Sequence, residues 1–116
     1  TAVNTVSGMI INVRARRPVL SNKQGGISGQ ALFPIALKCV YDIYEAVKIP
    51  IIGTGGVSTG EDALAMIMAG ATLVGVGSAI YYRGEDACMK IQHEMQTIMD
   101  EEKISSLEEI RGYAHE

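Results

Sequence analysis

Two short runs of consecutive apolar residues stand out along the chain. The first is Ile49-Pro-Ile-Ile-Gly53 and the second is Thr72-Leu-Val-Gly-Val-Gly77. Continuous apolar runs are typical of parallel strands that are covered on both faces. Between the runs, Ser58 and Thr59 stand at capping-box spacing from acidic residues, and Gly70 follows as a helix terminator. The pattern therefore predicts a βαβ unit.

Two longer segments repeat apolar residues at helical spacing. Between about residues 30 and 47, Pro34 falls in the first turns, where a helix tolerates its missing N–H group. The segment from about 85 to 101 has a similar period. We expect two amphipathic helices, packing through Ile35, Val40, Ile43 and Val47 in the first and Cys88, Ile91, Met95, Ile98 and Met99 in the second. A short last helix is expected after Ser106, because Glu109 follows at capping-box spacing.

The beginning of the chain has a different character. Thr1–Thr5 resembles the end of a strand, and the β-prone segments 8–13 and 17–20 flank a basic turn, so we expect a small protruding β-ribbon at an edge. Strands that alternate with helices predict an α/β fold with a parallel sheet. A few βα units cannot close a (β/α)8 TIM barrel and would leave apolar surface open. Since the chain also begins without a methionine, we expect it to be a piece of a larger protein.

Glycine-rich turns follow both apolar runs. Thr54-Gly-Gly-Val57 and Gly77-Ser78 come just after the predicted strands, where backbone can approach a ligand with no Cβ in the way. Each turn leads into a predicted helix, and two adjacent helix N-termini would direct unpaired N–H groups at one anion. The loop Ser21–Gly29 resembles a further anion-contacting turn. The pattern predicts a phosphate site; the alternative is that these glycines only permit tight turns in an ordinary α/β core.

Composition and charge narrow the possible functions. Apolar residues make up 47% and charged residues 20% of the 116 residues, an ordinary composition for a soluble domain. The formal net charge of -3 gives no basic excess for nucleic acid, and no apolar stretch is long enough to cross a membrane. We therefore expect a cytoplasmic enzyme. Cys39 and Cys88 show no spacing for a metal site or a disulfide framework, and His93 and His115 are expected to be solvated.

Asn4 and Thr5 place two polar side chains at the end of the first predicted strand. In a barrel this end faces the ligand. A carboxamide both donates and accepts hydrogen bonds, so Asn4 could pair with the cyclic amide or imide edge of a ring. An Asn-Thr turn that caps its own backbone fits the dipeptide equally well.

Four motifs, taken together in their order and spacing, resemble one enzyme family. They are Asn4-Thr-Val-Ser-Gly-Met9, Gly25-Gly-Ile-Ser-Gly29, Ile51-Ile-Gly-Thr-Gly-Gly-Val57 and Val74-Gly-Val-Gly-Ser78. Over essentially its whole length, the chain is similar to the C-terminal part of dihydroorotate dehydrogenase. The last two motifs occur in many phosphate-binding barrels, and the first two make the resemblance more specific. It implies that residues 1–116 are the C-terminal segment of a single FMN-binding TIM-barrel domain.

Matched position by position, the family's ligand contacts fall on a small set of residues. Asn4 and Thr5 match substrate contacts, and Val3 matches a position beside the flavin. The matches to FMN contacts, mostly at the phosphate, are Gly29, Gly55, Gly56, Gly77 and Ser78. The family's catalytic base and its flavin-contacting lysine belong to an earlier part of the barrel. No catalytic residue is therefore expected in this chain, and neither cysteine matches the base.

The resemblance also implies a function for the complete protein. It would oxidise dihydroorotate to orotate with FMN in de novo pyrimidine synthesis, as a homo-oligomer. The Asn-Thr-x-x-Gly-Met form is most similar to the NAD-linked type, which passes electrons to a separate FAD and iron–sulfur subunit. The chain alone is expected to be inactive. Two alternatives stay open: another phosphate-binding TIM-barrel enzyme, or a non-catalytic phosphate- or flavin-binding fragment that works only with partner chains.

Overall fold

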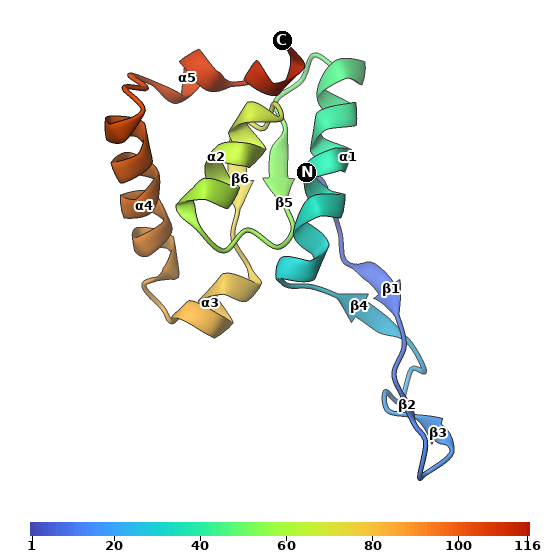
Figure 1. Cartoon of the computed structure of the whole chain (residues 1–116). Helices are drawn as coiled ribbons and strands as arrows, with labels where there is room; N and C mark the ends of the chain where they lie inside the picture. Colours follow the sequence, from blue (N-terminus) through green and yellow to red (C-terminus); the bar gives the residue numbers. More distant parts are fainter.

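The computed structural model describes residues 1–116 as a mixed α/β arrangement around a small parallel sheet (Figure 1). Strands β5 (Ile52–Thr54) and β6 (Leu73–Gly75) pair in parallel, with Ile52 beside Leu73. Ala2 adds a parallel bridge to Gly53 on the other edge of β5. The expected βαβ unit is therefore present, with strands shorter than the apolar runs that predict them.

Helices cover one face of this sheet. Helix α1 (Phe33–Ala46) packs on β5, α2 (Gly60–Met68) packs on β6, and the two helices contact each other. The opposite face is open, because the neighbouring side chains of Ile52 and Leu73 are 37% and 62% exposed. The apolar runs are thus covered on one face only within this chain, and the open face agrees with the expectation that a few βα units leave apolar surface open.

The core is centred on α2, which lies between the sheet and α4 (Ala87–Glu101). Its buried apolar residues are Ala63, Leu64, Met66 and Ile67. Helix α4 contributes Ala87 and Ile91 to this core, and α1 contributes Ala36 and Val40.

Two residues expected in the packing faces of the helices lie outside them. Ile35 is 50% exposed, and Cys88 is exposed. In each case the neighbouring alanine, Ala36 or Ala87, is fully buried instead. A small side chain fits where α1 packs on the sheet and where α4 packs on α2. The buried stripe of each helix is therefore displaced by one residue from the pattern of large apolar side chains.

The remaining helical turns frame the C-terminal part. Helix α3 (Ser78–Arg83) follows β6, and α5 (Leu107–Ile110) begins where Ser106 Oγ accepts a hydrogen bond from the Glu109 N–H group, as predicted. The turn η2 (Tyr113–His115) ends the chain.

The expectation that His115 is solvated is wrong, since its side chain is only 14% exposed. No helix has both the length and the apolar character needed to cross a membrane.

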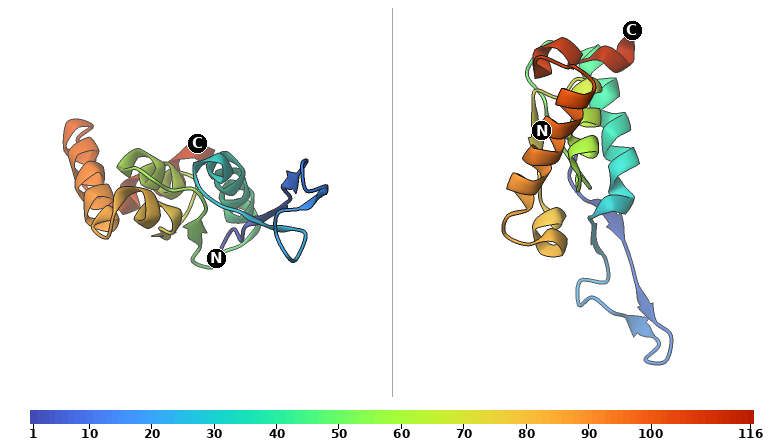
Figure 2. Two further views of the ribbon diagram at one scale, coloured as in Figure 1. Left: turned by 90° about the horizontal axis from the view of Figure 1, so that it is seen from below. Right: turned by 60° about the vertical axis from the view of Figure 1, so that its left-hand side comes forward.

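Residues 6–27 extend away from the helices as two antiparallel strand pairs (Figures 1 and 2). Strand β1 (Val6–Gly8) pairs with β4 (Gly25–Ile27), and β2 (Ile11–Asn12) pairs with β3 (Arg17–Pro18). The radius of gyration is 16.4 Å, against about 13 Å for a compact chain of this length. The chain is thus elongated, and the short turn η1 (Gln30–Leu32) connects this extension to α1.

Candidate functional site

A cavity of about 220 Å³ lies at the carboxyl ends of the parallel strands. Every substrate or cofactor contact predicted from the sequence lines it, namely Val3, Asn4, Thr5, Gly29, Gly55, Gly56, Gly77 and Ser78, together with Ser28, Leu32 and Thr54. The structure therefore brings together residues from separate parts of the chain that the sequence had assigned to one site.

Strand pairing explains why these segments meet. The N–H group of Val3 donates to the carbonyl oxygen of Thr54 at 2.7 Å, and Thr54 pairs with Gly75 on β6. These parallel segments therefore all end at the same end of the sheet. This end, formed by the carboxyl ends of the parallel strands, is where α/β proteins bind ligands.

The Gly55-Gly56 turn needs glycine for its backbone and for its packing. The φ angles are 138° and 73°, in the region that side chains disfavour. A Cβ on Gly56 would come within 2.6 Å of the carbonyl oxygen of Gly29 and 2.7 Å of the backbone nitrogen of Phe33. The turn therefore lies directly against the beginning of α1.

Gly29 and Gly77 differ from that turn, because added Cβ atoms would meet no protein atom within 4 Å. Gly29 has a φ of 95°, so its conformation still favours glycine, whereas Gly77 has a negative φ. The space beside both residues belongs to the cavity. A bound group, rather than the protein itself, would fill the volume that a side chain here would take.

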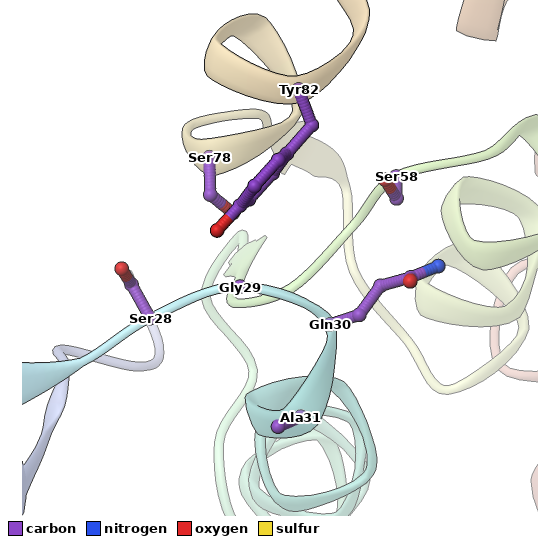
Figure 3. Close-up of a pocket in the computed structure, with 7 residues that line it drawn as sticks. All are labelled: Ser28, Gly29, Gln30, Ala31, Ser58, Ser78 and Tyr82. Atoms are coloured by element: carbon purple, nitrogen blue, oxygen red, sulfur yellow. The ribbon is translucent and has the colours of Figure 1, made fainter.

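A second cavity of about 370 Å³ adjoins the first and shares Ser28, Gly29 and Ser78 with it. Figure 3 shows Tyr82 beside Ser78, with Ser58 and Gln30 entering from the other side. Ser58, Gln30 and Tyr82 were not predicted as site residues. The i,i+4 spacing of Ser78 and Tyr82, which places them on one helix face, is a signal that could have indicated Tyr82.

The lining of both cavities suits a phosphate group held without a charged side chain. It combines hydroxyl groups with backbone at glycine turns, and it contains no lysine or arginine. Backbone N–H groups and hydroxyls of this kind bind phosphate by hydrogen bonds. A flavin phosphate fits this donor set, and the apolar Val3 and Leu32 in the same lining would suit the flavin ring, which the ribityl chain separates from the phosphate.

The N-terminus of α2 does not supply the free N–H groups that the sequence predicts. Asp62 Oδ2 accepts hydrogen bonds from the N–H groups of Ser58 and Thr59, at 2.9 and 3.0 Å. Thr59 and Asp62 form the capping box, and Glu94 from α4 accepts from the Gly60 N–H group at 2.8 Å. The prediction that two helix N-termini share one anion is therefore wrong at α2, because carboxylates of the protein already occupy it.

Asn4 uses part of its side chain locally. Its Oδ1 accepts a hydrogen bond from the Thr5 N–H group at 2.8 Å. The turn that caps its own backbone is therefore present. The Nδ2 group makes no hydrogen bond within the chain, so the donor half of the carboxamide remains available at the cavity.

Neither a metal-binding cluster nor a disulfide is present among the side chains of this chain. No group of histidine, cysteine, aspartate and glutamate residues is placed to hold a metal ion. Cys39 is half-buried and Cys88 exposed, and both are free thiols. Neither cysteine lines the two cavities.

Comparison with known proteins gives one consistent family. The family model described as dihydroorotate dehydrogenase matches residues 1–99. The catalytic subunit of dihydroorotate dehydrogenase B (NAD(+)) from Methanocaldococcus jannaschii is 50% identical over 115 residues, and that from Methanosarcina acetivorans is 47% identical over 115 residues. Each alignment covers 99% of this chain and 37% of the relative. The chain thus spans little more than a third of the length of these relatives.

A solved structure gives the same result. The crystal structure of dihydroorotate dehydrogenase from Eimeria tenella, in complex with ferulenol, superimposes with a TM-score of 0.75 at 34% sequence identity. The match covers 78% of this chain and 25% of that chain.

Proposed function

The chain belongs to the dihydroorotate dehydrogenase family, and we propose that residues 1–116 form the C-terminal segment of a single (β/α)8 barrel domain that binds FMN. The open sheet face at Ile52 and Leu73 supports this proposal, since the missing strands of a barrel would enclose it. The two antiparallel strand pairs would protrude outside the barrel wall.

The complete protein would oxidise dihydroorotate to orotate in pyrimidine synthesis. One observation carries this proposal: the residues that match the family's substrate and flavin contacts all line one cavity. Bound FMN would accept the hydride equivalent. Within this chain, Gly29 and Gly77 would leave room for the phosphate to approach the backbone, Gly55 and Gly56 would form the tight turn beside it, and Ser78 would donate its hydroxyl hydrogen to it.

Asn4 and Thr5 would orient the substrate beside the flavin. The free Nδ2 group of Asn4 can donate to a ring carbonyl while Oδ1 stays bonded to the Thr5 N–H group. The lining of the cavity contains no cysteine, histidine or carboxylate, and its serines, Ser28 and Ser78, do not match the family's base. The base would come from the part of the barrel outside these residues, so the 116-residue chain would be inactive alone.

The partners follow from the relatives. Those relatives are named catalytic subunits of the NAD(+)-type enzyme, a name that implies a separate electron-transfer subunit. We propose an FAD and iron–sulfur subunit in that role, a homo-oligomeric catalytic subunit, and a cytoplasmic location.

The test is made on the complete protein. Purified protein should release FMN on denaturation, identified by mass, and should reduce an acceptor dye when dihydroorotate is added. The separately produced 116-residue chain should not. Complete protein that takes up no FMN, or steady turnover by the short chain, would contradict the proposal.

A further inference from the structure

Arg83, at the end of α3, connects three segments of the chain. Its guanidinium group forms a hydrogen-bonded ion pair with Glu94 on α4. Through Nη1 it also donates a hydrogen bond to the backbone carbonyl oxygen of Ser58, in the loop that follows the Gly55-Gly56 turn. Because a guanidinium group presents several donors in a fixed plane, one side chain can hold both partners.

Glu94 holds the same loop from its other end. Its Oε2 accepts a hydrogen bond from the Gly60 N–H group at 2.8 Å. A Cβ on Gly60 would come within 2.5 Å of the backbone nitrogen of Met95 and 2.6 Å of Glu94 Cβ. Glycine at this position therefore lets α2 approach α4 closely enough for the carboxylate to reach the helix N-terminus.

The ion pair between Arg83 and Glu94 keeps Glu94 in the charged form that binds the N-terminus of α2. The hydrogen bond from Arg83 holds the pKa of Glu94 below its usual range, so the carboxyl group is ionised near neutral pH. A carboxylate at the N-terminus of α2 is also favourable for the helix dipole. The side chains of Arg83 and Glu94 are 26% and 35% exposed, so water only partly screens them.

Packing and hydrogen bonds hold the backbone between these contacts and the cavity. Val57, which joins the Gly55-Gly56 turn to Ser58, is 2% exposed and packed in the core. The backbone of Ser58 is held at its carbonyl oxygen by Arg83 and at its N–H group by Asp62. Its side chain meanwhile lines the cavity that also contains Ser78 (Figure 3). A shift of Arg83 would therefore move the Ser58 hydroxyl and the adjoining glycine turn.

We propose that Arg83 and Glu94 are positioning residues that fix the segment 55–58 for binding of a phosphate group at this end of the cavity. The inference rests on the proposed function, since that function supplies the phosphate as part of FMN. Neither residue lines either cavity, and both act through the backbone of the loop.

The complete flavoprotein, freed of its flavin, tests this proposal by titration with FMN and with riboflavin, which lacks the phosphate. Arg83→Met should raise the FMN dissociation constant by about tenfold, which corresponds to about 1.4 kcal/mol, the scale of one hydrogen bond. The riboflavin dissociation constant should not change. Arg83→Lys should give an intermediate loss, because one ammonium group cannot hold Ser58 and both Glu94 oxygens together.

Lys38→Met is the matched control, because Lys38 forms an exposed ion pair with Asp42 on α1, away from the loop. It should leave both dissociation constants unchanged. If Arg83→Met does not fold, Glu94→Gln replaces it, since an amide oxygen can still accept from Gly60 while the ion pair is lost.

Two results would overturn the positioning role. Equal weakening of FMN and riboflavin would show only a general structural defect, and unchanged FMN affinity in folded Arg83 and Glu94 variants would show no effect on the site. Wild-type protein that binds riboflavin and FMN equally would overturn the phosphate assignment, and wild type that binds neither would overturn the proposed function as well.

Discussion

His115, in the last turn of the chain, stacks on Tyr41 of α1 with ring centroids 3.8 Å apart and 15° between the ring planes. Its Nε2 lies 3.1 Å from the carbonyl oxygen of Ala69, just after α2, and its Nδ1 lies 3.4 Å from Glu45 Oε1. One side chain therefore joins the C-terminal turn to two helices of the core.

Replacing His115 by alanine should loosen this C-terminal turn. An aromatic pair of this kind contributes about 1 kcal/mol, so local opening should become roughly fivefold more frequent. The Gly112 N–H group, which donates to the carbonyl oxygen of Ile67 at 3.1 Å, reports on that opening. Hydrogen exchange of residues 111–116 in the complete protein should become faster. The control is His93→Ala, on the exposed side of α4. Equal exchange rates in the two variants would show that the stacking of His115 on Tyr41 does not stabilise the turn.

Gly77 offers a test of the flavin site that does not depend on backbone strain. An added Cβ would meet no protein atom within 4 Å, so Gly77→Ala should fold normally. If the phosphate occupies this space, FMN binding should weaken by about 1 to 3 kcal/mol, the usual cost of a methyl group in an already filled volume. The FMN content after gel filtration and a fluorescence titration would measure the change.

The control is Gln92→Ala, at an exposed position of α4 outside both cavities. It should retain FMN even if it lowers stability. Gly56→Val should lose FMN together with local order, because its side chain meets the backbone of Gly29 and Phe33. Wild-type FMN affinity in Gly77→Ala would place the phosphate elsewhere.

The parts of the fold that the sequence predicts correctly depend on patterns among residues close in sequence. The parallel strands, the Thr59–Asp62 capping box and the helix end at Gly70 each depend on residues close in sequence. The sequence assigns these residues to one site because the four motifs occur in the same order and spacing as in the family. The geometry explains their meeting, since each group follows a strand end on the same edge of the sheet.

Contacts between distant residues account for what the sequence did not indicate. Glu94 occupies the N-terminus of α2 from 34 residues away, so free N–H groups were wrongly expected there. His115 is isolated in the sequence yet packs against Tyr41. The burial of Ala36 in place of Ile35 depends on the close approach of α1 to the sheet, which helical spacing alone does not determine.

Glu94 should make the stability of the protein depend on pH. Because its pKa is lower in the folded state than in the unfolded state, its stabilising contribution is present above the unfolded pKa and is lost as the pH falls toward the folded one. Wild type should therefore resist urea better than Glu94→Gln near neutral pH. The difference should shrink below about pH 4, where a free glutamate takes up a proton. Urea midpoints measured from pH 7 to pH 3 would test this, with the exposed Glu101→Gln as control; a difference that stays constant with pH would contradict it.

Asn4 provides the sharpest test of substrate recognition, because its two halves have different partners. Oδ1 accepts from the Thr5 N–H group, whereas Nδ2 has no hydrogen-bond partner in the chain, and the residue lines the cavity. If Nδ2 donates to the pyrimidine ring, Asn4→Ala in the complete protein should weaken orotate binding by about 1 to 3 kcal/mol, the cost of a buried polar group left without its partner. FMN should stay bound, because no flavin contact is removed.

Asn4→Asp separates the two roles of this side chain. Its carboxylate can still accept from the Thr5 N–H group, so the local turn should persist, but it has no hydrogen to donate to the ring. Orotate, itself an anion, should therefore bind Asn4→Asp at least as weakly as Asn4→Ala, while the flavin spectrum stays that of the wild type. Weak binding by Asn4→Ala alone, with full affinity in Asn4→Asp, would show that Asn4 acts through its own turn and makes no donor contact with the substrate.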